Sequence, residues 1–149
     1  MNAPKETVTK ALQSTLVELI DLSLLGKQAH WNVVGPQFRS VHLELDEIVD
    51  LARLSSDRVA ERLATVGVAP DGRAETVSTT SELAPFPDGF VPTTDIVQRM
   101  TQAMDMVSVR MKERIVGVGD DDPVTQDILI STTDELEKAA WMLRSQLTM

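Results

Sequence analysis

Four stretches of this 149-residue sequence place apolar residues at every third or fourth position. In residues 7–33 the series is Val8, Leu12, Leu16, Leu19, Leu22 and Leu25, and comparable series run through residues 38–66, 93–116 and 124–147. Such spacing makes one apolar stripe along an α-helix. Gly35-Pro36, Gly67 and the segment from Gly117 to Pro123 separate the stretches and mark helix ends. The pattern therefore predicts four long helices.

Four helices of this length favour an all-α, ferritin-like four-helix bundle, and we expect it to form a single domain over residues 1–149. The connection between the second and third helices, residues 67–92, is rich in Pro and Gly, and residues 78–83 can form one short helix within it. A bundle of such helices is about 40 Å long at ~1.5 Å per residue, which this connection can span. One long crossover of this kind is typical of ferritin-like connectivity.

Composition excludes several classes of function. The chain has no cysteine, which rules out disulfide scaffolds, zinc–thiolate sites, iron–sulfur clusters and thiol nucleophiles. Its net charge of -9 argues against a protein that grips nucleic-acid phosphates or an anionic membrane. No apolar run approaches the ~18 residues of a membrane span, and no signal core is seen at the start, so we expect a cytoplasmic protein.

The residues able to carry chemistry fall into two groups. Antiparallel helices joined near residue 35 place His30 within reach of His42, and Asp46 lies one helical turn beyond His42. Asp57 and Glu61 form a second pair, one turn apart. Because Asp46 and Asp57 are eleven residues apart, ~16 Å of helix separates them. One chain therefore cannot bring both groups to a single small metal site.

Two arrangements remain open for these residues. Either the chain has two incomplete sites, or a partner chain supplies the missing half across a two-fold axis, which would create two identical sites. Imidazole and carboxylate without thiol suit iron or zinc, with iron favoured where coordination positions stay open. A bundle without any site also remains open, because single histidines are often structural and carboxylate pairs often lie on solvated helix faces. Trp31 and Trp141 are then core or interface anchors.

The segment from His30 to Phe38, with sequence HWNVVGPQF, is followed by His42, Asp46, Asp57 and Glu61. This pattern, His-x11-His-x3-Asp-x10-Asp-x3-Glu, resembles the ferroxidase centre of the Dps family, the DNA-protection-during-starvation proteins or miniferritins. The motif Glu61-Arg62-Leu63, Gly67 and the segment from Trp141 to Ser145 are similar to that family too. The resemblance covers nearly the whole chain.

The resemblance implies a hollow homododecamer with 23 symmetry and two ferroxidase sites at each two-fold interface. One chain would supply His30 and His42, its neighbour would supply Asp57 and Glu61, and Asp46 would bind or bridge beside the histidines. All five would be metal-binding and catalytic. The implied activity is that of an oxidoreductase that converts Fe²⁺ to Fe³⁺, with hydrogen peroxide preferred over oxygen, and stores ferric mineral in the shell.

The family also uses acidic residues at the start of the fourth helix to line a three-fold channel. Here these residues would be Asp122 and Asp127, with Ser131 one turn further along the same lumen. The alternative interpretation is that these aspartates are only the negative charges that commonly stabilise the N-terminus of a helix. Many members compact the nucleoid through a basic flexible tail, which is the alternative function for this chain. Its N-terminal segment offers only Lys5 and Lys10 against Glu6, so we expect no DNA binding.

The charge leads to a testable prediction about DNA. Twelve copies at -9 give a shell of roughly -108, facing a polymer with one negative charge per ~1.7 Å. The densest basic group, Arg110, Lys112 and Arg114, is diluted by Glu113. We expect that metal-free dodecamer will not retard plasmid DNA in a gel run at 0.15 M salt, in parallel with a basic protein as positive control. Retardation under these conditions would instead favour the nucleoid function.

Overall fold

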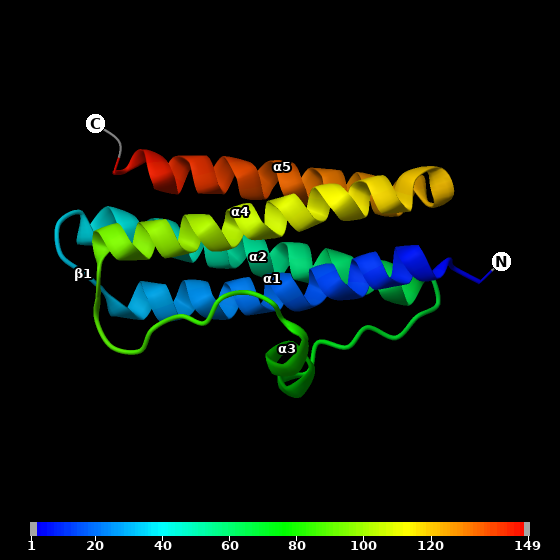
Figure 1. The fold of residues 1–149 in the computed structure, drawn as a ribbon, viewed down its shortest axis with the longest axis horizontal. Coiled ribbons are helices and arrows are strands. Elements are labelled where there is room, and N and C mark those ends of the chain that lie inside the picture. The colour runs from blue at the N-terminus through cyan, green and yellow to red at the C-terminus, as the bar shows by residue number, and fades with distance from the viewer. Residues whose placement is uncertain (1–2, 148–149) are drawn as a thin grey trace.

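The computed structural model describes residues 3–147. In this range four long helices lie side by side along the long axis of the molecule: α1 (Glu6–Asn32), α2 (Phe38–Thr65), α4 (Thr93–Val118) and α5 (Pro123–Ser145) (Figure 1). α1 and α2 form one antiparallel hairpin, and α4 and α5 form the other. The predicted ferritin-like four-helix bundle is confirmed.

The apolar stripes of the four helices meet in one continuous core. Its largest fully buried side chains are Leu12, Leu19, Leu22, Leu45, Ile48, Leu63, Ile96, Met100, Met104, Met111, Leu129 and Leu136. Burying these stripes removes apolar surface from water, and this burial stabilises the helices more than their intrinsic propensity does. Within residues 3–147, none of the helices has the length and apolar character needed to cross a membrane.

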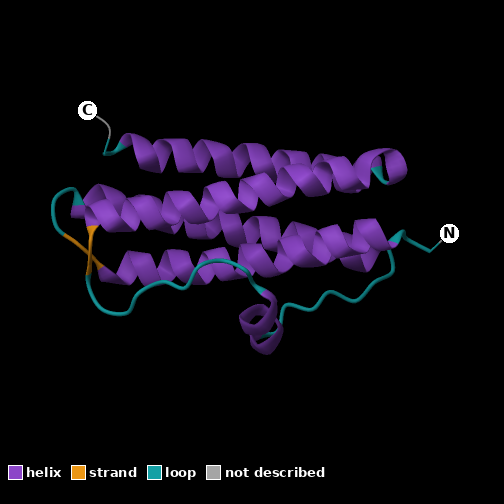
Figure 2. Ribbon diagram, in the orientation of Figure 1, coloured by secondary structure: helices purple, strands orange, loops and turns teal. Residues whose placement is uncertain are grey.

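The segment that connects the two hairpins starts at the end of α2 and reaches the opposite end of the bundle, where α4 begins (Figures 1 and 2). It crosses the outer side of α1 and carries the short helix α3 (Ala74–Thr80). The long crossover is thus confirmed. It makes α4 run parallel to α2 and antiparallel to α1.

The position predicted for the short helix, residues 78–83, is wrong. The helix begins earlier because the Asp71 carboxylate accepts hydrogen bonds from the Arg73 backbone and the Thr76 hydroxyl, which order its first turn. It ends at Thr80 because Ser81 is extended and donates its hydroxyl to the carboxylate of Asp21 on α1. The contact with α1, which is remote in sequence, overrides the local pattern.

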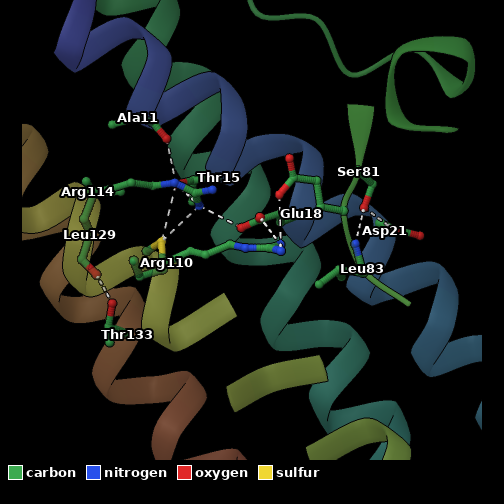
Figure 3. Close-up of polar contacts among 12 residues, drawn as sticks. Ala11, Thr15, Glu18, Asp21, Ser81, Leu83, Arg110, Arg114, Leu129 and Thr133 are labelled. Carbon is green, nitrogen blue, oxygen red and sulfur yellow. Dashed lines mark hydrogen bonds and ion pairs between the residues drawn. The ribbon is translucent and has the colours of Figure 1, made fainter. Parts of the chain in front are cut away.

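Polar contacts also attach α4 to α1 beneath the crossover (Figure 3). The Glu18 carboxylate is 5% exposed and accepts hydrogen bonds from Arg110 at 2.8 Å and from Arg114 at 2.7 Å. Arg110 also forms an ion pair with Glu82 of the crossover at 3.2 Å. A buried carboxylate without such partners would be strongly destabilising. The network therefore fixes α1, α4 and the crossover relative to one another.

A two-residue parallel pairing closes the end of the bundle where the first hairpin turns. Strand β1 (Val33–Val34) follows α1 directly, and strand β2 (Val91–Pro92) precedes α4. Val33 pairs with Val91, and both side chains are buried. This contact ties the turn between α1 and α2 to the start of α4. It thereby orders the end of α1, where His30 lies, and the neighbouring helix ends.

Gly26 of α1 lies in tight contact with Val49 of α2. A Cβ atom built on Gly26 would lie 2.7 Å from Cγ2 of Val49 and 3.7 Å from Cε of Met100. Real Cβ atoms essentially never approach another heavy atom so closely, so only glycine fits here without a shift of the neighbouring side chains. The hydrogen atom of Gly26 lets the two helices pack near the histidines.

We expect the substitution Gly26→Ala to lower the free energy of unfolding. Overpacking a tight core contact costs about 1–3 kcal/mol, which outweighs the ~1 kcal/mol that alanine gains over glycine in a helix. The matched control is Gly117→Ala in α4, where a Cβ meets nothing within 4 Å and stability should rise slightly. Urea unfolding of both variants measures the difference. If Gly26→Ala were as stable as the wild type or more stable, Gly26 would not be the tight contact described here.

Candidate metal centre

His30 and His42 face each other across the first hairpin, as predicted. His30 lies in the last turn of α1 and is buried, while His42 lies in the second turn of α2. Their rings are stacked, with centroids 3.7 Å apart and an angle of 17° between the planes. Phe38, one turn before His42 on α2, stacks its ring on the His42 ring, with the two ring centroids 5.0 Å apart.

Each histidine is oriented by the backbone of the other. Nδ1 of His30 lies 2.7 Å from the carbonyl oxygen of His42, and Nδ1 of His42 lies 2.8 Å from the carbonyl oxygen of His30. A carbonyl oxygen only accepts hydrogen bonds, so Nδ1 must carry the proton in both rings. In a neutral ring this leaves the lone pair on Nε2, the atom that can bind a metal ion.

Asp46 joins this pair from the next turn of α2. Its Oδ1 lies 3.5 Å from Nδ1 of His30 and forms an ion pair with Nζ of Lys27 on α1. The hydrogen bond from Lys27 holds the pKa of Asp46 below its usual range. The structure therefore brings together His30, His42 and Asp46, and adds an ammonium group beside the carboxylate.

Asp57 and Glu61 lie further along α2, and both are exposed. Within residues 3–147, neither carboxylate has a hydrogen-bond or ion-pair partner, so both are free to bind a cation. α2 is continuous from Phe38 to Thr65, so the ~16 Å of helix between Asp46 and Asp57 is preserved. In the same described range, no three His, Cys, Asp or Glu side chains are arranged so that they could hold a metal ion by themselves.

The two groups are therefore separate in one chain, as their spacing predicts. His30, His42 and Asp46 form one cluster, which we call the histidine half-site. Asp57 and Glu61 form the other, the carboxylate half-site. The five-residue ferroxidase centre, which needs both half-sites, stays a prediction.

The two aspartates predicted to line a pore differ from each other. Asp122 is the N-cap of α5: its carboxylate accepts hydrogen bonds from the backbone N–H and hydroxyl of Thr125. It also forms two hydrogen bonds of 2.8 Å with Nη2 of Arg62 on α2. Asp127 is exposed, and Ser131 is partly buried one turn later. The charge of Asp122 is thus matched by Arg62, whereas that of Asp127 is not matched within the described residues.

Two residues near these groups were not expected from the sequence. Lys27 precedes His30 by three residues, and that spacing places both on the same helix face. The spacing alone does not show that the ammonium reaches Asp46 on α2. Arg62 is 60 residues from Asp122, and no local signal connects the two.

Comparison with known proteins identifies the class of this fold. The family model described as a ferritin-like domain matches residues 9–149. The curated DNA protection during starvation protein of Mycolicibacterium smegmatis is 38% identical over 144 residues, which cover 94% of this chain and 76% of that protein. The chain belongs to the Dps family of ferritin-like proteins.

Other relatives match most of this chain at a similar identity. The fine tangled pili major subunit of Haemophilus ducreyi is 37% identical over 94% of this chain and 74% of its own length. DNA protection during starvation protein 2 of Deinococcus radiodurans is 37% identical, and this chain spans 57% of its length. Among solved structures, Dps92 of Deinococcus radiodurans superposes with a TM-score of 0.93 at 36% identity over 96% of this chain and 87% of that one.

The Asp122–Arg62 pair leads to a prediction about stability against pH. Burial raises the pKa of the Asp122 carboxyl, but the hydrogen bonds from Arg62 and Thr125 outweigh it, so the pKa lies below its usual value. A carboxyl with a lowered pKa stabilises the fold above its unfolded pKa, about 4, and loses that contribution as the pH falls further. We expect Asp122→Asn to cost about 1–2 kcal/mol at pH 7 and progressively less below pH ~4.

The measurement is the free energy of unfolding of both proteins between pH 7 and pH 2. Asp127→Asn serves as the matched control, since it removes the same charge from an exposed position on the same helix. Its effect should be small throughout. If the cost of Asp122→Asn were independent of pH, the carboxylate would not be the group that Arg62 and Thr125 stabilise.

Proposed function

We propose that this protein oxidises Fe²⁺ to Fe³⁺ at sites shared by two subunits, and stores the ferric product as mineral inside a hollow homododecamer in the cytoplasm. Membership of the Dps family supports a general role in iron storage and in DNA protection. The observation that carries the finer proposal is the division of the ligands into a histidine half-site and a carboxylate half-site on one continuous helix.

The positions of the half-sites on α2 suit a two-fold axis. His42 and Glu61 are equally far in sequence from the Leu51–Ala52 peptide bond, and so are Asp46 and Asp57. If the α2 helix of a second subunit packed antiparallel about that point, the histidine half-site of each subunit would face the carboxylate half-site of the other. The same symmetry would place Asp50 opposite Arg53, two exposed residues of opposite charge. An isologous interface of this kind creates two complete sites at once.

The surface around the half-sites also favours a partner. Large apolar side chains are exposed on the outer side of the α1–α2 hairpin: Leu24, Trp31, Leu43 and Leu54, of which Trp31 is 66% and Leu54 64% exposed. Trp31 and Leu43 each follow one of the two histidines, and Leu54 lies one turn before Asp57. Exposed apolar groups of this size are typical of surfaces that are covered in an assembly.

The donor set suits the proposed substrate. Nε2 of each histidine supplies a neutral ligand, and Asp57 and Glu61 supply two negative charges, which stabilise Fe³⁺ more than Fe²⁺ and so favour oxidation. One hydrogen peroxide molecule would accept an electron from each of two Fe²⁺ ions, take up two protons and leave as two water molecules. The protein's part is to hold the iron with positions open to the oxidant.

The entry route remains part of the proposal. Because the charge of Asp122 is matched by Arg62, we assign attraction of Fe²⁺ at a three-fold channel chiefly to Asp127. A free carboxylate in a narrow passage raises the local concentration of cations. Ser131 would make the next level of the channel less acidic.

DNA binding is the second candidate function, because several relatives carry DNA protection in their names. DNA is also protected when Fe²⁺ and peroxide are consumed, and this needs no contact with DNA. The net charge of -9 per chain favours this indirect protection.

Mixed assemblies test the shared site. One variant carries His30→Ala and His42→Ala, and the other carries Asp57→Ala and Glu61→Ala; each alone should be inactive in Fe²⁺ oxidation followed by absorbance. In a mixed two-fold pair, one site keeps all its ligands and the other keeps none. With random pairing half of the pairs are mixed, so we expect recovery of about a quarter of the wild-type rate.

A matched control removes two carboxylates elsewhere: Glu75→Ala with Asp88→Ala changes exposed positions of the crossover and should keep full activity. Native mass spectrometry with one heavier variant verifies that mixed shells form. If shells that contain both variants show no recovery, the sites are not shared between subunits as proposed.

A further inference from the structure

We propose that a groove between the crossover and α4 binds one free carboxylic acid of the fatty-acid type, which combines an apolar chain with a single carboxylate. The groove has a volume of about 580 Å³ and is lined by the crossover, by α4 and by Leu25 of α1. We call it the crossover groove. Its lining contains none of the residues of the two half-sites, so this inference goes beyond the proposed function and does not rest on it.

The walls of the crossover groove are mostly apolar. After α3 the crossover continues along the outer side of α1 to the start of α4 (Figure 1), and the groove lies between this stretch and α4. On the α4 side, Met106 is 47% exposed and Val109 57% exposed, so this apolar wall is open to solvent. A hollow of this size and character is typical of small-molecule sites. The main apolar lining residues are Leu25, Leu83, Phe86, Ala103, Met106 and Val109.

The crossover side of the groove is held in place before a ligand arrives. The Ser81 hydroxyl donates a hydrogen bond to the Asp21 carboxylate of α1 (Figure 3), and the Glu82 carboxylate lies 3.2 Å from Nη2 of Arg110 on α4. Leu83, the next residue, is buried against the core. Because these contacts fix the wall, a ligand would pay little to order it.

The charges of the lining select a negative group. Both acidic residues of the groove are already paired: Glu82 with Arg110, and Asp105 with Arg144 of α5, whose Nη2 lies 2.6 Å from Oδ2 of Asp105. Arg99 is exposed and has no side-chain hydrogen bond or ion pair within residues 3–147. The unmatched charge of the lining is therefore positive, and a carboxylate is the complementary partner of a guanidinium.

The positions on α4 suit an elongated ligand. Arg99, Ala103, Met106 and Val109 recur at helical spacing along one side of α4, and the ten residues from Arg99 to Val109 span ~15 Å. A carboxylate bound by Arg99 would therefore leave its chain lying over Ala103 and Met106 towards Val109. Gln102, three residues after Arg99, also lines the groove and can donate an amide hydrogen to the carboxylate. The net charge of -9 opposes an anionic membrane as the occupant.

Equilibrium dialysis of labelled decanoate, below its micellar concentration, measures binding to the full-length protein. We expect one decanoate per chain, and affinity about tenfold lower in Arg99→Met, since the charge-assisted hydrogen bonds are lost. Arg99→Lys, which keeps the charge, should recover part of the affinity. Butanoate should bind much more weakly because it buries fewer methylene groups, and decan-1-ol because it has no charge for Arg99.

The matched control is Lys112→Met, which removes a positive charge from an exposed position of the same helix. Lys112 pairs with Glu137 of α5 and does not line the groove, so its loss should leave decanoate affinity unchanged. Methyl NMR of the labelled methionines locates the ligand. The methyl signal of Met106 should shift when decanoate binds, whereas that of Met142, which is exposed on α5, should stay in place.

Weaker binding in Arg99→Met, with Lys112→Met unchanged and the Met106 signal shifted, supports the proposal. If decanoate does not bind, or binds Arg99→Met as tightly as wild type, the groove does not take a carboxylic acid. Binding to anionic phospholipid vesicles without binding of free decanoate would also overturn it, in favour of a membrane. If Arg99→Met fails to fold, Met106→Glu gives the same test, because a carboxylate placed in the groove repels decanoate and should lower its affinity.

Discussion

The close antiparallel contact between α1 and α2 is the constraint on which the rest of this structure depends. Gly26 allows Val49 to approach α1, and one turn later the two histidines exchange hydrogen bonds with each other's backbone. The rings are thus held by main-chain atoms of two packed helices, which move less than side chains. Preorganised ligands of this kind lose little entropy when a metal ion binds.

The crossover stabilises this hairpin from outside. Because it runs the full length of the bundle, α4 is antiparallel to α1, and the arginines that surround Glu18 link these two helices. The buried carboxylate adds specificity rather than much stability, since burying the charges costs about as much as their attraction returns. A different placement of α4 would leave Glu18 buried and unpaired, and this penalty favours the observed arrangement.

The charge distribution suggests why the proposed chemistry would depend on assembly. The histidine half-site is close to neutral, because Lys27 balances Asp46, whereas the carboxylate half-site carries two unpaired charges. Neither half-site would bind a divalent cation firmly by itself. Bringing them together would unite neutral nitrogen ligands with negative charge, and would at the same time cover the apolar residues around Trp31 and Leu54.

The sequence by itself determined the four helices, the long crossover and the separation of the half-sites, because all three follow from local periodicity and the fixed rise of a helix. It also indicated that His30 meets His42, since a short turn forces neighbouring helices to run antiparallel. Only the tertiary structure decided the position of α3, the pairing of Lys27 with Asp46 and that of Arg62 with Asp122. These contacts join residues 19 and 60 positions apart, or a loop to a distant helix. They depend on how whole helices are rotated and packed, which no local pattern specifies.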